Sequence, residues 1–156
     1  MSLAEEVDLL RGISLFERME PAKLKLLAMT SDRVNFRPNA VMMRQGDDGD
    51  AAYVIISGKG QVLIGTPGSE IQVAEIGAGQ IVGEIAILID VPRTATVKTA
   101  EGLTALKISK ENFLRLLHGS PQVAVEIILE LALRLENTNA QLRAAVAADK
   151  GRSAVP

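Results

Sequence analysis

The strongest constraint on the fold is a rhythm of short apolar runs between residues 32 and 109. These runs are rich in Val and Ile, and Gly, Asp or Pro separates them about every ten residues. They occupy residues 34–36, 41–44, 53–56, 61–64, 71–74, 95–98 and 103–106. Regularly spaced short strands with turn signals between them are typical of all-β sandwiches and barrels. The rhythm therefore predicts a sandwich or barrel of short antiparallel strands.

Helical patterns flank this β segment on both sides. Leu3, Val7 and Leu10 recur at helical spacing near the start of the chain. Pro21 suits the first turn of a further helix, because a proline at that position loses no hydrogen bond. We therefore expect N-terminal helices over residues 1–31.

The region of residues 110–148 also has a helical pattern. Ser109 suits the cap of a short helix that ends at Gly119, and Pro121 suits the start of a long one. The long helix carries a seam with coiled-coil spacing. Its members are Ile128, Leu131, Leu135, Thr138, Leu142 and Ala145. We expect a homodimer through this seam, a helix end near Ala148 and a flexible tail over residues 149–156; the alternative is that the seam packs on the β segment.

The composition argues against several classes of function. The 156 residues carry 17 basic and 19 acidic side chains, for a formal charge of −2, and only 3% are aromatic. Proteins that bind nucleic acid are usually basic, and single-strand binders stack bases on aromatic rings, so we expect no direct DNA binding by this chain. The chain has no Cys and a single His, His118, which leaves no thiolate nucleophile and no His/Cys metal cluster. The lack of Cys suits a cytoplasmic protein, and no apolar run reaches the roughly 18 residues of a membrane span.

Three segments resemble nucleotide or metal loops without fitting them. The glycines of residues 77–83 lack the G-x-G-x-x-G spacing of a dinucleotide loop. The aspartates of residues 46–50 lack the acidic residue that closes an EF-hand loop, so this segment is interpreted as a solvated turn. Residues 57–60 do not form a Walker motif and are interpreted as a hairpin turn.

The segment of residues 83–97 carries the informative chemistry. Gly83 lets a ligand approach the backbone, and Glu84 begins a short apolar stretch predicted to form one helical turn, whose free amides favour anions. Arg93 offers a planar fork that matches two phosphate oxygens. Glu84 is an acceptor suited to a sugar hydroxyl. Together these groups suit a ribose next to a phosphate; the alternative is that Glu84 and Arg93 simply pair near the surface.

At these residues the sequence resembles the cyclic nucleotide-binding domain family, which includes the catabolite activator protein, kinase regulatory subunits and cyclic-nucleotide-gated channels. Residues 83–86 and 92–97 match its phosphate-binding cassette, here residues 83–95, and the match extends to residues 44–47 and 53–58. The resemblance implies a mainly β fold with flanking α-helices. Its core would be an eight-stranded antiparallel β-roll of the double-stranded β-helix (jelly-roll) type over residues 32–109, with N-terminal helices and a long C-terminal helix.

The resemblance also implies roles for individual residues. Arg93 would bind the cyclic phosphate, Glu84 the ribose 2′-hydroxyl, and the backbone at Gly83, Ile85 and Ala86 would complete the anion site. Thr94 would contact the phosphate or a guanine base. Three valines would form an apolar wall, namely Val62, Val73 and Val82.

The long helix carries the residues implied for base recognition. Thr138 would contact the base in its own subunit and Asn139 the base held by the partner; the alternative is an ordinary polar break in a helix. The ligand would be cAMP or cGMP. A threonine at position 94 favours cGMP, whereas hydrogen bonds from adenine N6 to Thr138 and Asn139 favour cAMP, and we expect cAMP to bind more tightly.

These features predict a non-catalytic sensor rather than an enzyme. Residues 1–148 would form one cyclic nucleotide-binding domain that moves its C-terminal helix on ligand binding and acts on an unidentified downstream protein. No cofactor, metal or membrane insertion is expected, and we expect no helix-turn-helix segment after the long helix. Two alternatives stay open: the chain is the sensor half of a longer transcription factor or channel, or a scaffold with a vestigial site.

Overall fold

The computed structural model describes the backbone of residues 2–153 and the side chains of residues 2–151. The chain forms two compact units, and the boundary lies between Ala124 and Val125. The first unit contains all the strands and the shorter helices. The second unit consists of the long helix alone, apart from that helix's first turn.

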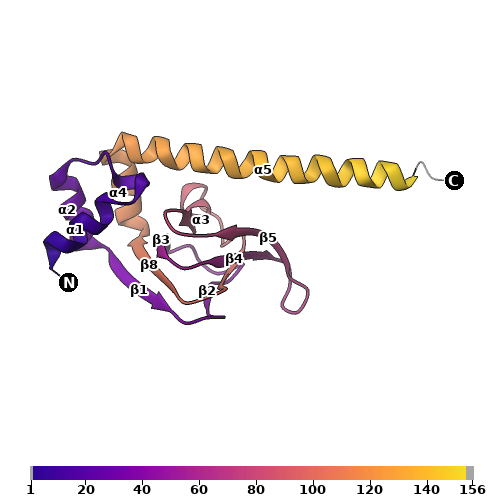
Figure 1. The fold of residues 1–156 in the computed structure, drawn as a ribbon, viewed down its shortest axis with the longest axis horizontal. Helices are drawn as coiled ribbons and strands as arrows, with labels where there is room; N and C mark the ends of the chain where they lie inside the picture. Colours follow the sequence, from indigo (N-terminus) through magenta and orange to yellow (C-terminus); the bar gives the residue numbers. More distant parts are fainter. Residues whose placement is uncertain (1, 154–156) are drawn as a thin grey trace. The chain divides into compact units, whose positions relative to one another are not determined.

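The first unit is built on two four-stranded antiparallel sheets. Figure 1 shows the arrangement of the labelled strands. In one sheet the order is β1-β8-β3-β6, and in the other it is β2-β7-β4-β5. The strands are β1 (Asp32–Phe36), β2 (Val41–Met43), β3 (Ala51–Ser57), β4 (Gly60–Ile64), β5 (Ile71–Ile76), β6 (Ile81–Val82), β7 (Thr96–Thr99) and β8 (Leu103–Ser109). The mainly β fold with eight antiparallel strands and flanking helices is therefore confirmed.

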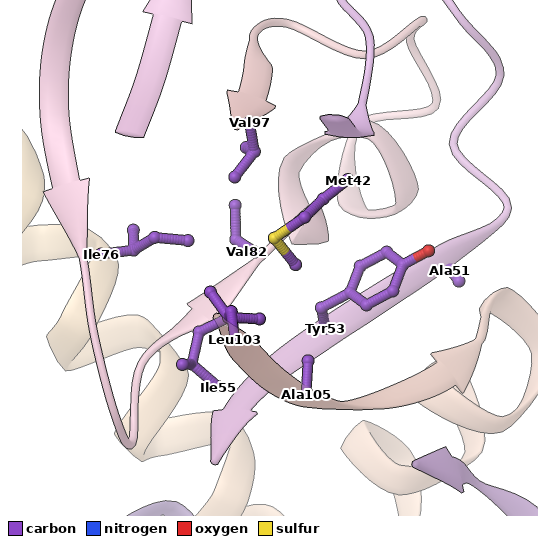
Figure 2. Close-up of a cluster of buried hydrophobic side chains, with 9 residues drawn as sticks. All are labelled: Met42, Ala51, Tyr53, Ile55, Ile76, Val82, Val97, Leu103 and Ala105. Carbon is purple, nitrogen blue, oxygen red and sulfur yellow. The ribbon is translucent and has the colours of Figure 1, made fainter. Parts of the chain in front are cut away.

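The apolar core contains side chains from both sheets (Figure 2). Its buried members are Met42, Ala51, Tyr53, Ile55, Ile76, Val82, Val97, Leu103 and Ala105. β3 is buried over its first five residues, because one of its faces looks into this core while α3 and α4 pack against the same strand. This double covering explains why β3 has an almost continuous apolar sequence rather than an alternating one.

Three helical segments precede the sheets: α1 (Leu3–Arg11), the 3₁₀ helix η1 (Ser14–Phe16) and α2 (Pro21–Thr30). After β8, α4 (Lys110–Gly119) packs on α2 and on strands β3 and β8 (Figure 1). The expected caps are present, since the Ser109 side chain accepts a hydrogen bond from the Asn112 amide and Pro21 is the first residue of α2. The buried side chains Phe16, Leu24 and Phe113 anchor these helices in the first unit.

The turn between β3 and β4 differs from the predicted hairpin. β3 and β4 belong to different sheets, so residues 57–60 carry the chain from one sheet to the other. Gly58 has φ of +94°, and a Cβ on it would lie 2.3 Å from the carbonyl oxygen of Gly102. Two apolar runs with a glycine-containing turn between them look the same in sequence whether the strands pair or separate, which is why the hairpin prediction was wrong.

The long helix α5 (Pro121–Ser153) continues past the expected end near Ala148. Residues 149–153 are helical, so the tail expected there is not present, and residues 154–156 lie outside the described part of the chain. Four alanines at 144, 145, 147 and 148 have the highest helix propensity, and no proline stops the helix before Pro156. Within residues 2–153 no single helix is both long and apolar enough to cross a membrane; only α4 and α5 taken together, as a bent pair, meet those criteria by length and composition.

Candidate functional site

The cassette of residues 83–95 forms one continuous excursion between two strands. β6 ends at Val82, Gly83 follows as the N-cap, and the single-turn helix α3 (Glu84–Leu88) confirms the predicted helical turn. The chain then reverses through Asp90, which has φ of +52°, and passes Arg93 before β7 begins. This path brings Gly83 and Arg93, ten residues apart in sequence, into direct contact.

The Arg93 guanidinium is buried, with 4% of the residue exposed. Its Nη1 donates to the Gly83 carbonyl oxygen at 2.9 Å, and its Nη2 donates to the Ala51 carbonyl oxygen at 2.7 Å. The carboxylate of Asp50 lies 3.4 Å from Nη2. Two backbone carbonyls on different segments therefore fix the orientation of the fork, and the exposed Asp50 carboxylate is its ion-pair partner.

The backbone of Arg93 is fixed separately from its side chain. The Arg93 amide donates to the Asp47 carbonyl oxygen at 2.7 Å, and the Gly46 amide donates to the Arg93 carbonyl oxygen at 2.8 Å. The turn of residues 46–50 was interpreted from sequence as a solvated turn. Its aspartate side chains are exposed, but its backbone packs on the cassette, so that interpretation is correct only for the side chains.

Gly83 meets two requirements that exclude other residues. Its φ is +88°, a region that side chains with a Cβ rarely adopt. A Cβ at this position would lie 2.5 Å from Arg93 Nη1 and 3.1 Å from the Ala51 carbonyl oxygen. The contact between the Gly83 backbone and the Arg93 guanidinium thus depends on the missing side chain.

Glu84, Ile85 and Ala86 form the first turn of α3. Glu84 and Ala86 are buried, whereas Ile85 is partly exposed. Arg93 forms an ion pair with Asp50, and both Glu84 and Arg93 are buried, so the alternative of a simple pair near the surface is not what the structure shows. First-turn amides have no acceptor within their own helix, and the helix dipole makes this end favourable for negative charge.

The three valines of the predicted apolar wall have different surroundings. Val82 belongs to the buried core cluster, and Val62 packs against that cluster while half-buried. Val73 is exposed and lies on the edge strand β5, at the irregular register opposite Val62 and Leu63. Val62 and Val82 therefore both lie at the core cluster, whereas Val73 lies outside it.

Thr94 is exposed directly after Arg93. Thr138 and Asn139 belong to the second unit, where Thr138 is exposed and Asn139 is half-buried. The Thr138 hydroxyl donates to the Arg134 carbonyl oxygen at 2.9 Å within α5. Glu136 forms an ion pair with Arg143 on the same helix at 2.7 Å.

Sequence reasoning missed the roles of Asp50, Ala51 and Gly49. Asp50 and Ala51 contact the Arg93 fork, and a Cβ on Gly49 would lie 2.5 Å from the Ala86 Cβ. A buried arginine must have hydrogen-bond acceptors. A backbone carbonyl acceptor or a close backbone contact does not require a particular residue type, so the sequence does not reveal where it lies. Among the described residues no group of three or more His, Cys, Asp or Glu side chains could hold a metal ion.

Comparisons with known proteins agree with this geometry. The family model for the cyclic nucleotide-binding domain matches residues 33–120. A cAMP-dependent protein kinase regulatory subunit from Dictyostelium discoideum is 37% identical over 116 residues, covering 72% of this chain and 34% of that protein. A CRP-like cAMP-activated global transcriptional regulator from Mycobacterium tuberculosis is 26% identical over 136 residues, covering 86% of this chain and 61% of that protein.

A solved structure extends the comparison to three dimensions. The sensor domain of the transcriptional regulator DNR from Pseudomonas aeruginosa matches with a TM-score of 0.72 at 28% identity, covering 86% of this chain and 91% of that one. The chain spans less than two thirds of the length of the two curated relatives above.

Proposed function

Because this chain belongs to the cyclic nucleotide-binding domain family, as the resemblance over residues 83–97 predicted, we propose that it is a non-catalytic sensor that binds cAMP more tightly than cGMP. The observation that carries the proposal is the buried Arg93 fork, held against Gly83 at the start of α3. A buried cation beside a row of helix-start amides suits a small anion.

Arg93 is the proposed phosphate ligand. Its guanidinium has more N–H donors than its three hydrogen bonds to Gly83, Ala51 and Asp50 use. In this proposal the remaining donors bind phosphate oxygens, and the amides of Ile85 and Ala86 bind the same group. Thr94, exposed next to Arg93, would add a hydroxyl donor.

Glu84 and the valines are proposed to hold the ribose. A carboxylate accepts a hydrogen bond from a hydroxyl donor and repels phosphate, so Glu84 suits the 2′-hydroxyl. Val62, Val73 and Val82 would give the sugar and base an apolar wall; the burial of Val62 and Val82 beside the core supports two of the three.

The cAMP preference rests on Thr138 and Asn139. The Thr138 hydroxyl hydrogen is already donated to the Arg134 carbonyl, which leaves the oxygen lone pairs to accept from an amine. Adenine N6 is such a donor, whereas guanine presents a carbonyl oxygen at the same ring position. Asn139 of a partner subunit would accept from the same amine in a homodimer formed through the seam from Ile128 to Ala145.

The proposed output is a movement of the C-terminal helix that an unidentified downstream protein reads. A ligand shifts a conformational equilibrium only by its difference in affinity for the two states. In this proposal the nucleotide contacts both the cassette and Thr138, and it would therefore bind more tightly to the state of the helix that permits both contacts.

Calorimetric titration with cAMP, cGMP and the non-cyclic 5′-AMP tests the proposal. We expect cAMP to give the lowest Kd, cGMP a higher one, and 5′-AMP the weakest binding, because its dianionic, freely rotating phosphate does not match a site for a cyclic monoanion. Tighter binding of cGMP would refute the preference, and no binding of either cyclic nucleotide would refute the function.

A further inference from the structure

A second surface of the first unit, away from the cassette, lies between α2 and α4. It is an open groove of about 220 Å³, here called the α2–α4 groove. Its apolar lining includes Met19, Leu26, Leu27 and Leu116. Small-molecule sites usually enclose about 300–1,000 Å³, so this groove is better matched to one or two anchoring side chains of a protein than to a metabolite.

Hydrogen bonds at both ends of the two helices fix the groove. The Lys23 ammonium, in the first turn of α2, donates to the carbonyl oxygen of Gly119 at the end of α4. The Asn112 side chain, near the start of α4, donates to the carbonyl oxygen of Thr30 at the end of α2, at 3.3 Å. The helices are therefore antiparallel and tied together at each end. A groove formed in advance does not need to be ordered when a partner binds, which favours binding.

Leu26 is the exposed leucine of the groove lining. It is 60% exposed although it lines the groove, while its neighbours Leu24 and Leu27 are buried in the first unit. An exposed leucine at the mouth of an apolar groove offers a contact that the isolated chain does not use.

The charge of the groove indicates what would cover it. Its ionisable lining residues are Lys23 and Arg115, both basic, and no acidic side chain lines it. Neither residue forms an ion pair within the described part of the chain. The whole chain has a formal charge of −2, so this local positive surface opposes the overall charge. Charge complementarity selects an acidic partner over a second copy presenting an average part of its own surface.

We infer that the α2–α4 groove is a docking site for an acidic amphipathic helix of a partner protein. Leucine-like anchors at helical spacing would enter between Leu26 and Leu116, and flanking carboxylates would meet Lys23 and Arg115. This is the helix-in-groove mode of peptide recognition. The inference goes beyond nucleotide binding and does not require it.

A synthetic helical peptide with leucines on one face and glutamates elsewhere is the probe, and the same peptide with lysines for the glutamates is its control. Amide chemical shifts of the full chain should change on the glutamate peptide at Leu26, Leu27, Thr30 and Leu116, and fluorescence polarisation should show about tenfold weaker binding of the lysine peptide. The variant Arg115→Glu, which leaves the hydrogen bond from Lys23 to Gly119 in place, should reduce that preference. Arg37→Glu, which changes an exposed cation outside the groove, should leave the preference unchanged.

Leu26 and Met29 supply a matched pair that is independent of charge. Both are exposed on α2, at 60% and 64%, but only Leu26 lines the groove. Leu26→Ala should weaken binding of the glutamate peptide by about fivefold or more, whereas Met29→Ala should change it by less than about twofold. Equal binding of the two peptides, shift changes elsewhere on the surface, or equal effects of the two alanine variants would overturn the inference. So would self-association of the chain that Leu26→Ala abolishes, because the groove would then belong to a second copy.

Discussion

The cassette and the polar stretch of α5 are both proposed to contact the nucleotide, yet their side chains are positioned in different ways. Arg93 is held by carbonyl oxygens from Gly83 and Ala51, and its backbone is bonded to the turn of residues 46–50. On α5, the Thr138 hydroxyl donates to the Arg134 carbonyl oxygen and Glu136 pairs with Arg143, and both partners belong to the same helix. Tertiary contacts thus hold the cassette in place before a ligand binds. The roles of the α5 side chains depend instead on which ligand or subunit the helix contacts.

The largest effect is expected when the Arg93 guanidinium, which the cassette holds in place, is removed. Arg93→Ala should weaken cAMP binding by about 30-fold to several thousand-fold, because truncating one partner of a buried charge pair costs about 2–5 kcal/mol. Calorimetry measures the change. The variant should also unfold more easily, since the carbonyl oxygens of Gly83 and Ala51 lose their donor.

Two further variants separate binding from folding at this position. Arg93→Lys keeps the charge but not the two-pronged geometry, and should recover only part of the affinity. Arg37→Ala removes an exposed cation and serves as the control. Binding by folded Arg93→Ala within threefold of the parent protein would show that Arg93 is not the phosphate ligand.

A matched pair of leucine variants tests the proposed role of α5 in dimerisation. Leu135 and Leu133 are similarly exposed, at 61% and 67%, but only Leu135 lies on the proposed seam. Leu135→Glu places an unpaired charge in that seam and should raise the dimer dissociation constant by about 100-fold, whereas Leu133→Glu should have little effect. Sedimentation at tens of micromolar, with and without cAMP, distinguishes the outcomes. A monomeric parent protein would rule the seam out.

The contact between Gly83 and Arg93 makes a separate prediction about the cassette. Gly83→Ala should weaken cAMP binding by about 10- to 100-fold, because its Cβ would displace Nη1 and a hydrogen bond to a charged group is worth about 1.5–3 kcal/mol. Gly79→Ala is the matched control, since Gly79 has φ of +84° but open space around its missing Cβ. Both variants should lose about 1–2 kcal/mol of unfolding free energy from the left-handed backbone. Equal effects on nucleotide affinity would show that the steric contact is unimportant.

The smallest effect is expected at the base. Thr138→Ala should reduce the preference for cAMP over cGMP by about two- to tenfold, the value of one neutral hydrogen bond. Thr138→Ser keeps the hydroxyl and should keep the preference. Competition binding with both nucleotides measures it, and an unchanged ratio in Thr138→Ala would assign the threonine to local helix geometry alone.

The sequence predicted the elements better than their connections. The β rhythm, the cap at Ser109 and the single turn after Gly83 follow from local chemistry, so seven of the strands and the short helices were predicted near their observed positions. The two-residue strand β6 (Ile81–Val82) was not among the predicted runs, because two residues are too few to give a pattern. Sheet membership depends on long-range pairing, and the turn at residues 57–60 was therefore misread as a hairpin. The end of α5 was set too early because alanine-rich ends carry no stop signal.

The residues of the candidate site differ in the same way: some belong to a local motif and others are brought in by long-range contacts. Gly83, Glu84 and Arg93 form a compact motif whose residue types reveal their chemistry. Asp50, just before β3, and Ala51, its first residue, reach Arg93 through a carboxylate and a main-chain oxygen. Such contacts cannot be predicted from a local sequence pattern. Every residue has a backbone acceptor, and the fold determines which acceptor lies next to Arg93.

The main-chain hydrogen bonds between Arg93 and the turn of residues 46–50 do not depend on the side chain at position 93. The Arg93 amide and carbonyl form these bonds, so every residue except proline preserves them. Protein engineers therefore have a backbone attachment point that stays bonded when the recognising group is replaced, provided that the new side chain also supplies donors to the carbonyl oxygens of Gly83 and Ala51. A neutral hydrogen-bonding side chain installed there, with Glu84 retained for the sugar, is a starting point for receptors that read uncharged nucleosides.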